Sequence, residues 1–300
     1  MKWHTGGCMH DYSVQQIPPE PHPQRPAGYR APDQFIVRGT LPLGPFAFQH
    51  PPWGTAQMPK DQGIYEFDQV TAVDGEFTLD NLFWSSCDSS YTRCVFRQTG
   101  RATSKTRTSG RGEPAAGLLG RRPSSYQDCA FDHVDFGLSD GGFDLGEARF
   151  LRCTFRYCSY RWFRSTHADF IDCTFIGVMQ SAWFWGATPL GEERPRRNQF
   201  TGNDLSRAKP RRVLFRNGLD LSSNRLPEGP EYLHLDRFRQ RLQRARAAVA
   251  AWPEEERRDA EIILDVYEED DMDILFSWRR SLARPASPVW ALLEALELPG

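Results

Sequence analysis

The amino-acid sequence predicts a mainly β fold, a solenoid of stacked coils that ends in a cap of α-helices. The first observation is a five-residue period from Tyr126 to Trp183, in which a small residue precedes an aromatic residue by two positions. A short fixed period is the sequence signature of a solenoid. The same phrase recurs upstream, over residues 75–98, and downstream, over residues 198–215. After Asn224 the apolar spacing changes to three and four residues, which indicates amphipathic helices.

The period places one small and one bulky side chain in the interior at each step. Its phrases are Cys129-Ala130-Phe131, Val134-Asp135-Phe136, Ala148-Arg149-Phe150, Cys153-Thr154-Phe155, Cys158-Ser159-Tyr160, Ala168-Asp169-Phe170 and Cys173-Thr174-Phe175. Because side chains alternate along an extended backbone, the first and third residues of a phrase point the same way. The predicted core ladder is Cys129, Phe131, Phe136, Ala148, Phe150, Cys153, Phe155, Cys158, Tyr160, Ala168, Phe170, Cys173 and Phe175.

The phrase resembles the repeat of the pentapeptide-repeat family, whose unit reads roughly Ala-(Asp/Asn)-Leu-x-x. The resemblance implies a right-handed parallel β-helix of roughly five coils, in which four units make one square coil. Residues twenty positions apart would then stack on adjacent coils. Four like-on-like pairs have this spacing: Ala148 with Ala168, Phe150 with Phe170, Cys153 with Cys173, and Phe155 with Phe175.

The segments outside the repeat have different compositions. Residues 1–32 are rich in proline and polar residues, and we expect a disordered tail because such a segment buries little apolar surface. Residues 33–74 contain short apolar runs between turns and are predicted to cap the unpaired end of the solenoid. The remaining segments are the solenoid over residues 75–222, its basic insertion at 97–125, its excursion at 184–197 and the helical C-terminal region at 230–300.

The C-terminal region predicts two long helices and a short last one. The first helix would bury Leu235, Phe238, Leu242, Ala245, Val249 and Trp252. The second would begin near Pro253 and bury Ala260, Ile263, Leu264, Tyr267, Ile274, Leu275 and Trp278. The outward face of the first helix is basic and that of the second is acidic, so the two complement each other. The same acidic face could instead hold a divalent metal. A second copy of the chain, docked on these helices, is a candidate partner.

The insertion at 97–125 is the predicted partner-binding segment. It contains one acid, Glu113, and seven basic residues: Arg97, Arg101, Lys105, Arg107, Arg111, Arg121 and Arg122. Long loops without structure of their own are usually functional or disordered. A basic loop could engage nucleic acid or an acidic protein surface, or it could be a solvated insertion. In some members of the family that the repeat resembles, loops ejected from the coil contact the target. A further basic stretch, Arg207 to Arg216, could lie on the same edge or form a scattered surface.

Composition and motifs limit the chemistry that the sequence supports. The chain has 300 residues and a net charge of −2, with no apolar run of the roughly 20 residues that span a bilayer and no signal-peptide pattern. No Cys-x-x-Cys pair, phosphate-binding glycine loop or His-Glu-x-x-His occurs. We therefore expect no metal, no cofactor and no catalytic residue. Cysteines in the repeat are expected to be small buried hydrophobes in a reducing cytoplasm.

The leading functional prediction is a non-enzymatic protein-interaction scaffold with an unidentified protein partner. The resemblance implies an alternative, because well-understood members of that family mimic duplex DNA and protect DNA gyrase, a topoisomerase. Nucleic-acid binding through the basic insertion is a second alternative. An enzyme whose site lies between the solenoid and the helices is a third.

Overall fold

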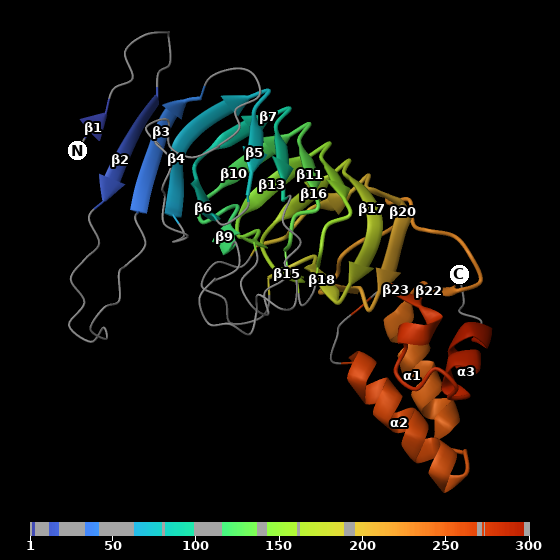
Figure 1. Ribbon diagram of the computed structural model, residues 1–300. Coiled ribbons are helices and arrows are strands. Elements are labelled where there is room, and N and C mark those ends of the chain that lie inside the picture. The colour runs from blue at the N-terminus through green and yellow to red at the C-terminus, as the bar shows by residue number, and fades with distance from the viewer. Residues whose placement is uncertain are drawn as a thin grey trace, which may run out of the picture.

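A computed structural model describes residues 2–3, 12–17, 34–41, 63–79, 82–98, 116–136, 143–160, 163–188, 196–268, 272 and 274–296. The fold is mainly β and consists of parallel sheets with a few helices. Figure 1 shows successive strands stacked side by side from β4 (Gly63–Val73) to β20 (Asp204–Arg211), with the helices beyond the last strands. This arrangement agrees with the mainly β class and the helical C-terminal region predicted from the sequence.

The secondary structure follows the chain in short steps. The other strands are β1 (Lys2–Trp3), β2 (Tyr12–Ile17), β3 (Gln34–Thr40), β5 (Glu76–Thr78), β6 (Leu82–Cys87), β7 (Ser90–Thr92), β8 (Val95–Arg97), β9 (Ala116–Leu118), β10 (Ser124–Gln127), β11 (Ala130–Asp132), β12 (Phe143–Asp144), β13 (Ala148–Leu151), β14 (Thr154–Arg156), β15 (Phe163–Ser165), β16 (Asp169–Ile171), β17 (Thr174–Gln180), β18 (Ala182–Trp185), β19 (Phe200–Thr201), β21 (Leu214–Arg216), β22 (Tyr232–Leu235) and β23 (Leu275–Trp278). The helices are α1 (Phe238–Val249), α2 (Glu254–Glu268), α3 (Val289–Ala295) and the 3₁₀ helix η2 (Arg279–Ser281).

Successive strands along the chain belong to different sheets in a repeating order. Each time the chain returns to a sheet, the new strand pairs with the strand that preceded it in that sheet. One sheet continues in the order β4-β7-β10-β13-β16-β19, and a second runs β5-β8-β11-β14-β17-β20. A third sheet consists of β15, β18 and β21. Strand β9 lies between β6 and β12, and β6 also pairs with β4. All of these pairings are parallel. Each passage through the sheets, here called a circuit, therefore stacks directly on the one before.

The register between circuits confirms the predicted stacking of aromatic residues. Phe150 lies opposite Phe170 in the β13–β16 pair, and Phe155 lies opposite Phe175 in the β14–β17 pair. The ring centroids of these pairs are 5.2 and 5.0 Å apart, with interplanar angles of 19° and 9°. Such aromatic pairs contribute about 0.5–1.5 kcal/mol each beyond the burial of their area. Phe131 extends the second column, because its ring stacks on Phe155 at 5.0 Å.

The interior is filled by the residues that the period predicts. All members of the core ladder are at most 5% exposed, and they belong to one continuous cluster that also includes Phe67 and Phe215. Neighbouring columns meet edge to face, as Phe150 and Phe155 do at 5.3 Å and 73°. Stacking between circuits and edge contacts between columns thus join the sheets through a solid aromatic core.

The N-terminal boundary differs from the prediction at two places. Strands β1 and β2 lie within residues 1–32, where we expected no order, and β2 pairs antiparallel with β3. Backbone pairing with an existing sheet edge orders these strands without much apolar burial. Strand β4, assigned by sequence to a separate cap, pairs in parallel with β6 and β7 and belongs to the stack. The rest of residues 1–32 lies outside the described residues.

The insertion and the excursion are shorter than predicted. Arg97 ends β8, and the segment from Ala116 onward contains β9 and the start of β10. Residues 99–115 lie outside the described residues. At the second interruption, Phe184 and Trp185 belong to β18, and an isolated bridge joins Ala187 to Arg197. The strands reach further into both interruptions because their neighbours in the sheets extend the pairing.

The second predicted helix ends at Glu268, and the apolar run Leu275–Trp278 forms β23 instead. This strand pairs antiparallel with β22, which contains Leu235 from the predicted first helix. Phe276 packs into the aromatic core of the stack, whereas Leu235 and Leu275 pack against the helices. The β22–β23 pair therefore forms a layer between the stack and the helices, with Leu233 and Leu275 buried and His234 exposed.

We expect Phe155→Ala to lower the free energy of unfolding by about 3–5 kcal/mol, because it removes a buried ring from a stacked column. Urea denaturation followed by circular dichroism measures this change. Tyr157→Ala is the control, because Tyr157 is 61% exposed and should cost less than about 0.5 kcal/mol. A loss below about 1 kcal/mol for Phe155→Ala would mean that the register is wrong.

Candidate functional site

The basic residues predicted to bind a partner lie partly inside the stack. Arg97 forms an ion pair with Glu76 at 2.8 Å, Arg121 with Glu66 at 3.0 Å, and Arg122 with Asp68 at 2.7 Å. These three arginines therefore hold circuits together rather than projecting from a free loop. The other four predicted residues, Arg101, Lys105, Arg107 and Arg111, lie outside the described residues.

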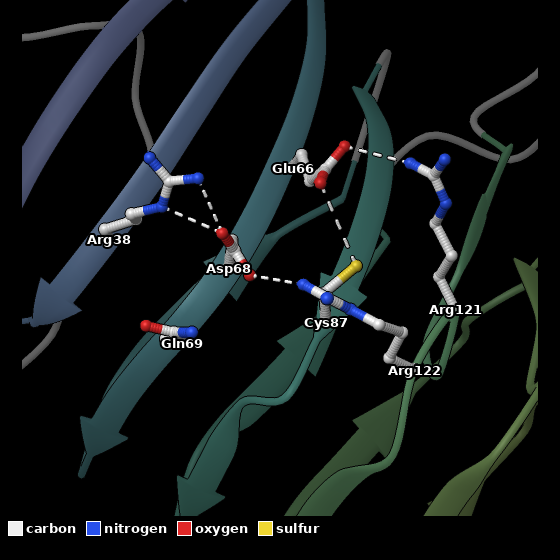
Figure 2. Close-up of a pocket in the computed structure, with 7 residues that line it drawn as sticks. All are labelled: Arg38, Glu66, Asp68, Gln69, Cys87, Arg121 and Arg122. Atoms are coloured by element: carbon white, nitrogen blue, oxygen red, sulfur yellow. Dashed lines mark hydrogen bonds and ion pairs between the residues drawn. The ribbon is translucent and has the colours of Figure 1, made fainter.

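Arg121 and Arg122 line a hollow of about 530 Å³ beside β4. Figure 2 shows its side chains converging from β3, β4, β6 and the segment after β9. Asp68 lies at the centre with its side chain 8% exposed, and it accepts hydrogen bonds from Arg38 Nε at 2.8 Å and Arg122 Nη2 at 2.7 Å. The acids and arginines of this hollow are paired with one another, so the hollow is an ion-pair network between circuits.

Cys87 adds a thiol to this hollow, with its Sγ 3.9 Å from Glu66 Oε1. Burial, and after it the charge of Glu66, raises the pKa of the Cys87 thiol. A thiol is a nucleophile only as the thiolate, and a raised pKa keeps it protonated at neutral pH. The arrangement therefore favours a structural role for Cys87 over a reactive one.

Four other buried cysteines, Cys94, Cys129, Cys153 and Cys173, donate to backbone carbonyls at one corner of successive circuits, and Cys158 does so at the next corner. Cys129 Sγ donates to the Tyr91 carbonyl at 3.4 Å, and Cys153 Sγ donates to the Tyr126 carbonyl at 3.2 Å. In a later circuit, Asn203 Nδ2 donates to the Phe170 carbonyl at 3.1 Å. An amide thus replaces the thiol at an equivalent position, which shows that the position needs a small hydrogen-bond donor. Burial also raises the pKa of Cys158 to about 12.

Charged residues alternate in sign along the outside of the stack. Asp74, Arg93, Asp128 and Arg152 occupy successive corners, all with positive φ between 52° and 55°. Arg93 Nε donates to Asp74 Oδ1 at 2.6 Å, and Arg152 Nε donates to Asp128 Oδ1 at 2.7 Å. These hydrogen bonds lower the pKa of both aspartates. The alternation makes this edge nearly neutral rather than acidic.

Strand β20 departs from this pattern. Arg207, Lys209 and Arg211 are exposed on its outward side, and no ion pair joins them to an acid among the described residues. In the sequence, these three cations occupy every second position within the basic stretch Arg207 to Arg216. The sequence alone left open whether that stretch formed a surface. We call Arg207, Lys209 and Arg211 the basic strip.

Comparison of the chain with family models, with curated proteins and with solved structures finds no match. Among the described residues, no group of three or more His, Cys, Asp and Glu is arranged to hold a metal ion. Within the same ranges, none of the helices combines the length and the apolar character needed to cross a bilayer.

We expect the described cysteines to resist thiol reagents in the folded protein, because they are buried and donate hydrogen bonds. The measurement is the rate of reaction with a colorimetric disulfide reagent at neutral pH in a Cys8→Ser variant, which retains the six cysteines described as free. The six should react only as fast as the protein unfolds, and denaturant should expose all of them at once. Rapid stoichiometric labelling without denaturant would contradict this account.

We expect stability to fall in acid because arginine lowers the pKa of Asp74 and Asp128 in the folded state. A lowered folded pKa adds stability above the ordinary aspartate pKa of about 4, and that stability is lost as the pH drops further. Urea midpoints measured from neutral pH downward should be level at first and then fall. The control is the double variant Arg93→Gln/Arg152→Gln, whose acid dependence should be weaker; an unchanged dependence would refute the role of these pairs.

Proposed function

We propose that the stacked sheets are the right-handed parallel β-helix of a pentapeptide-repeat protein, and that the protein is a non-enzymatic interaction scaffold. The first part is supported by the parallel register that sets Phe150 on Phe170 and Phe155 on Phe175. It is also supported by the small buried residues that precede these rings, such as Cys153 and Cys173.

The scaffold proposal rests on one observation: thiols and acids of the stack are occupied by contacts between circuits. Thiols donate to backbone carbonyls of the adjacent circuit, and the acids of the hollow beside β4 pair with Arg38, Arg121 and Arg122. These thiols and acids are thereby committed to joining circuits. The outer faces of the sheets are the surfaces that other molecules can contact, and the aromatic core holds them rigid. Rigid preformed surfaces bind without the entropic cost of ordering.

The charge pattern of the stack weighs against both alternatives, DNA mimicry and nucleic-acid binding through the insertion. Mimicry of duplex DNA needs a continuous acidic face, but Arg93 and Arg152 interrupt and pair the aspartates of the corner column. The nucleic-acid alternative depended on seven basic residues, of which Arg97, Arg121 and Arg122 are engaged by acids of the stack. Both alternatives remain outcomes that the following experiment distinguishes.

The test is affinity capture from a lysate of the source organism, with the intact protein beside a variant that lacks Thr99–Ala115. This deletion spares β8 and β9 and removes Arg101, Lys105, Arg107 and Arg111, the predicted basic residues that lie outside the described ones. We expect both baits to enrich the same protein, because the scaffold proposal places the partner on the sheet faces. Mass spectrometry of chemical crosslinks then maps the partner onto those faces.

Other results would replace the proposal. Enrichment of gyrase subunits that depends on Thr99–Ala115 would support topoisomerase modulation, and a supercoiling assay with purified gyrase would then measure it. Enrichment of nucleic acid alone, lost on deletion, would make the insertion the functional element. If neither bait retains any macromolecule at physiological salt, the scaffold proposal is wrong.

A further inference from the structure

The basic strip differs from equivalent positions in its own sheet. On earlier strands of that sheet, Arg97 pairs with Glu76 at 2.8 Å and Arg156 pairs with Asp132 at 2.6 Å. Arg207 continues the same outward column, because it lies opposite Ile176, which lies opposite Arg156. No ion pair joins the three cations of the strip to an acid among the described residues. Two acids lie near its ends: Asp204, whose charge interacts with that of Arg207, and Glu231. Clustered like charges cost electrostatic free energy, which an anionic partner would relieve.

A small hollow of about 210 Å³ lies at one end of the strip, where β20 meets the β22–β23 pair. It is lined by Lys209, Pro210, Arg211, Glu231, Tyr232 and Trp278. The Arg211 guanidinium stacks on the Trp278 ring, 4.8 Å from its centroid. Stacking fixes the plane of a guanidinium and leaves its N–H groups free at the edge, where a carboxylate can accept two hydrogen bonds.

An apolar patch borders the strip on the neighbouring circuits. Val178 on β17 lies opposite Lys209 and is 41% exposed, and Tyr157 is 61% exposed. Tyr157 is adjacent to β17, since its amide donates to the Ile176 carbonyl at 2.8 Å. Val178 thus lies beside the strip, and Tyr157 lies one circuit further away, on the other side of β17. An apolar centre with a charged border is typical of a protein interface.

We infer that the basic strip and its apolar border, Tyr157 and Val178, bind an extended acidic segment of a partner protein. This inference rests on the scaffold function proposed above and assigns its contact surface. Outward side chains on a strand repeat every second residue, about 6.6 Å apart. A partner segment in extended conformation with an acid at every second position has the same repeat. Its carboxylates would face the strip, while apolar residues beside them would cover Val178.

The segment would lie across the side chains of β20 rather than extend the sheet. Strand β20 is the last strand of its sheet, but it contains Pro210, which has no N–H to donate to an added strand. Proline on an edge strand is a common device against strand addition. Recognition is therefore left to the side chains of Arg207, Lys209 and Arg211.

The aromatic residues of the hollow favour an acidic protein over single-stranded nucleic acid. Nucleic-acid surfaces of this kind stack bases on free aromatic rings. Trp278 is already in contact with Arg211, and Arg280 lies 5.8 Å from the same ring. Tyr232 stacks on Phe276 with centroids 5.4 Å apart. Both rings of the hollow are thus engaged by this chain.

The test is fluorescence anisotropy with the full chain and a short labelled peptide in which glutamate alternates with valine and threonine. The variant Arg207→Gln/Lys209→Gln removes two strip cations and leaves the Arg211–Trp278 contact. Its matched control, Arg149→Gln/Arg258→Gln, removes two exposed arginines on β13 and α2. We expect the strip variant to weaken peptide binding by about tenfold or more, since one hydrogen bond to a charged group is worth about that factor. The control should bind like the intact protein, and high salt should weaken binding to both.

Two further probes, a neutral peptide and an oligonucleotide, distinguish binding of an acidic protein segment from binding of nucleic acid. A peptide with glutamine in place of glutamate should not bind, and an oligothymidylate of matched length should bind more weakly than the acidic peptide. Tighter binding of the oligonucleotide, lost in the strip variant, would make the strip a nucleic-acid surface and overturn the inference. Absence of peptide binding, or equal loss in the two variants, would also overturn it. In that case, a partner still captured by the strip variant would leave the scaffold proposal standing.

Discussion

Stacking of aromatic side chains between circuits is the interaction on which this structure depends. Phe131, Phe155 and Phe175 form one column with ring centroids 5.0 Å apart, and Phe150 and Phe170 belong to the adjacent column. The rings can stack only if the parallel strands that carry them keep their register. In the column of Phe131, Phe155 and Phe175, the cysteine two positions before each ring donates to a carbonyl of the preceding circuit, and Asn203 does the same in a later circuit.

The solid core determines what the surface can do. Because the interior is filled mainly by rings, most charged side chains lie outside, where neighbouring circuits bring them within hydrogen-bond distance of one another. Along most of the described stack the result is pairing of opposite charges, as between Asp128 and Arg152. The basic strip on β20 departs from this pairing, and it lies where the stack ends and the β22–β23 layer begins.

The sequence predicted the features that follow from local periodicity and missed those that depend on distant residues. Burial of Phe155 and its stacking on Phe175 follow from the spacing of the repeat. Pairing of Arg121 with Glu66 joins residues 55 positions apart, and no local spacing reveals it. The run Leu275–Trp278 suited a helix or a strand equally, because a short apolar run has no distinct period. Its pairing with β22 decided the outcome.

The most direct test of this account is a double-mutant cycle between Phe155 and Phe175 in urea denaturation, with leucine at each position so that the variants still fold. Rings stacked in adjacent circuits should show a coupling of about 0.5–1.5 kcal/mol. Phe131 and Phe175 occupy the same column two circuits apart and should couple by less than about 0.5 kcal/mol. Absence of coupling between Phe155 and Phe175, or equal coupling in the two cycles, would contradict the stacked register.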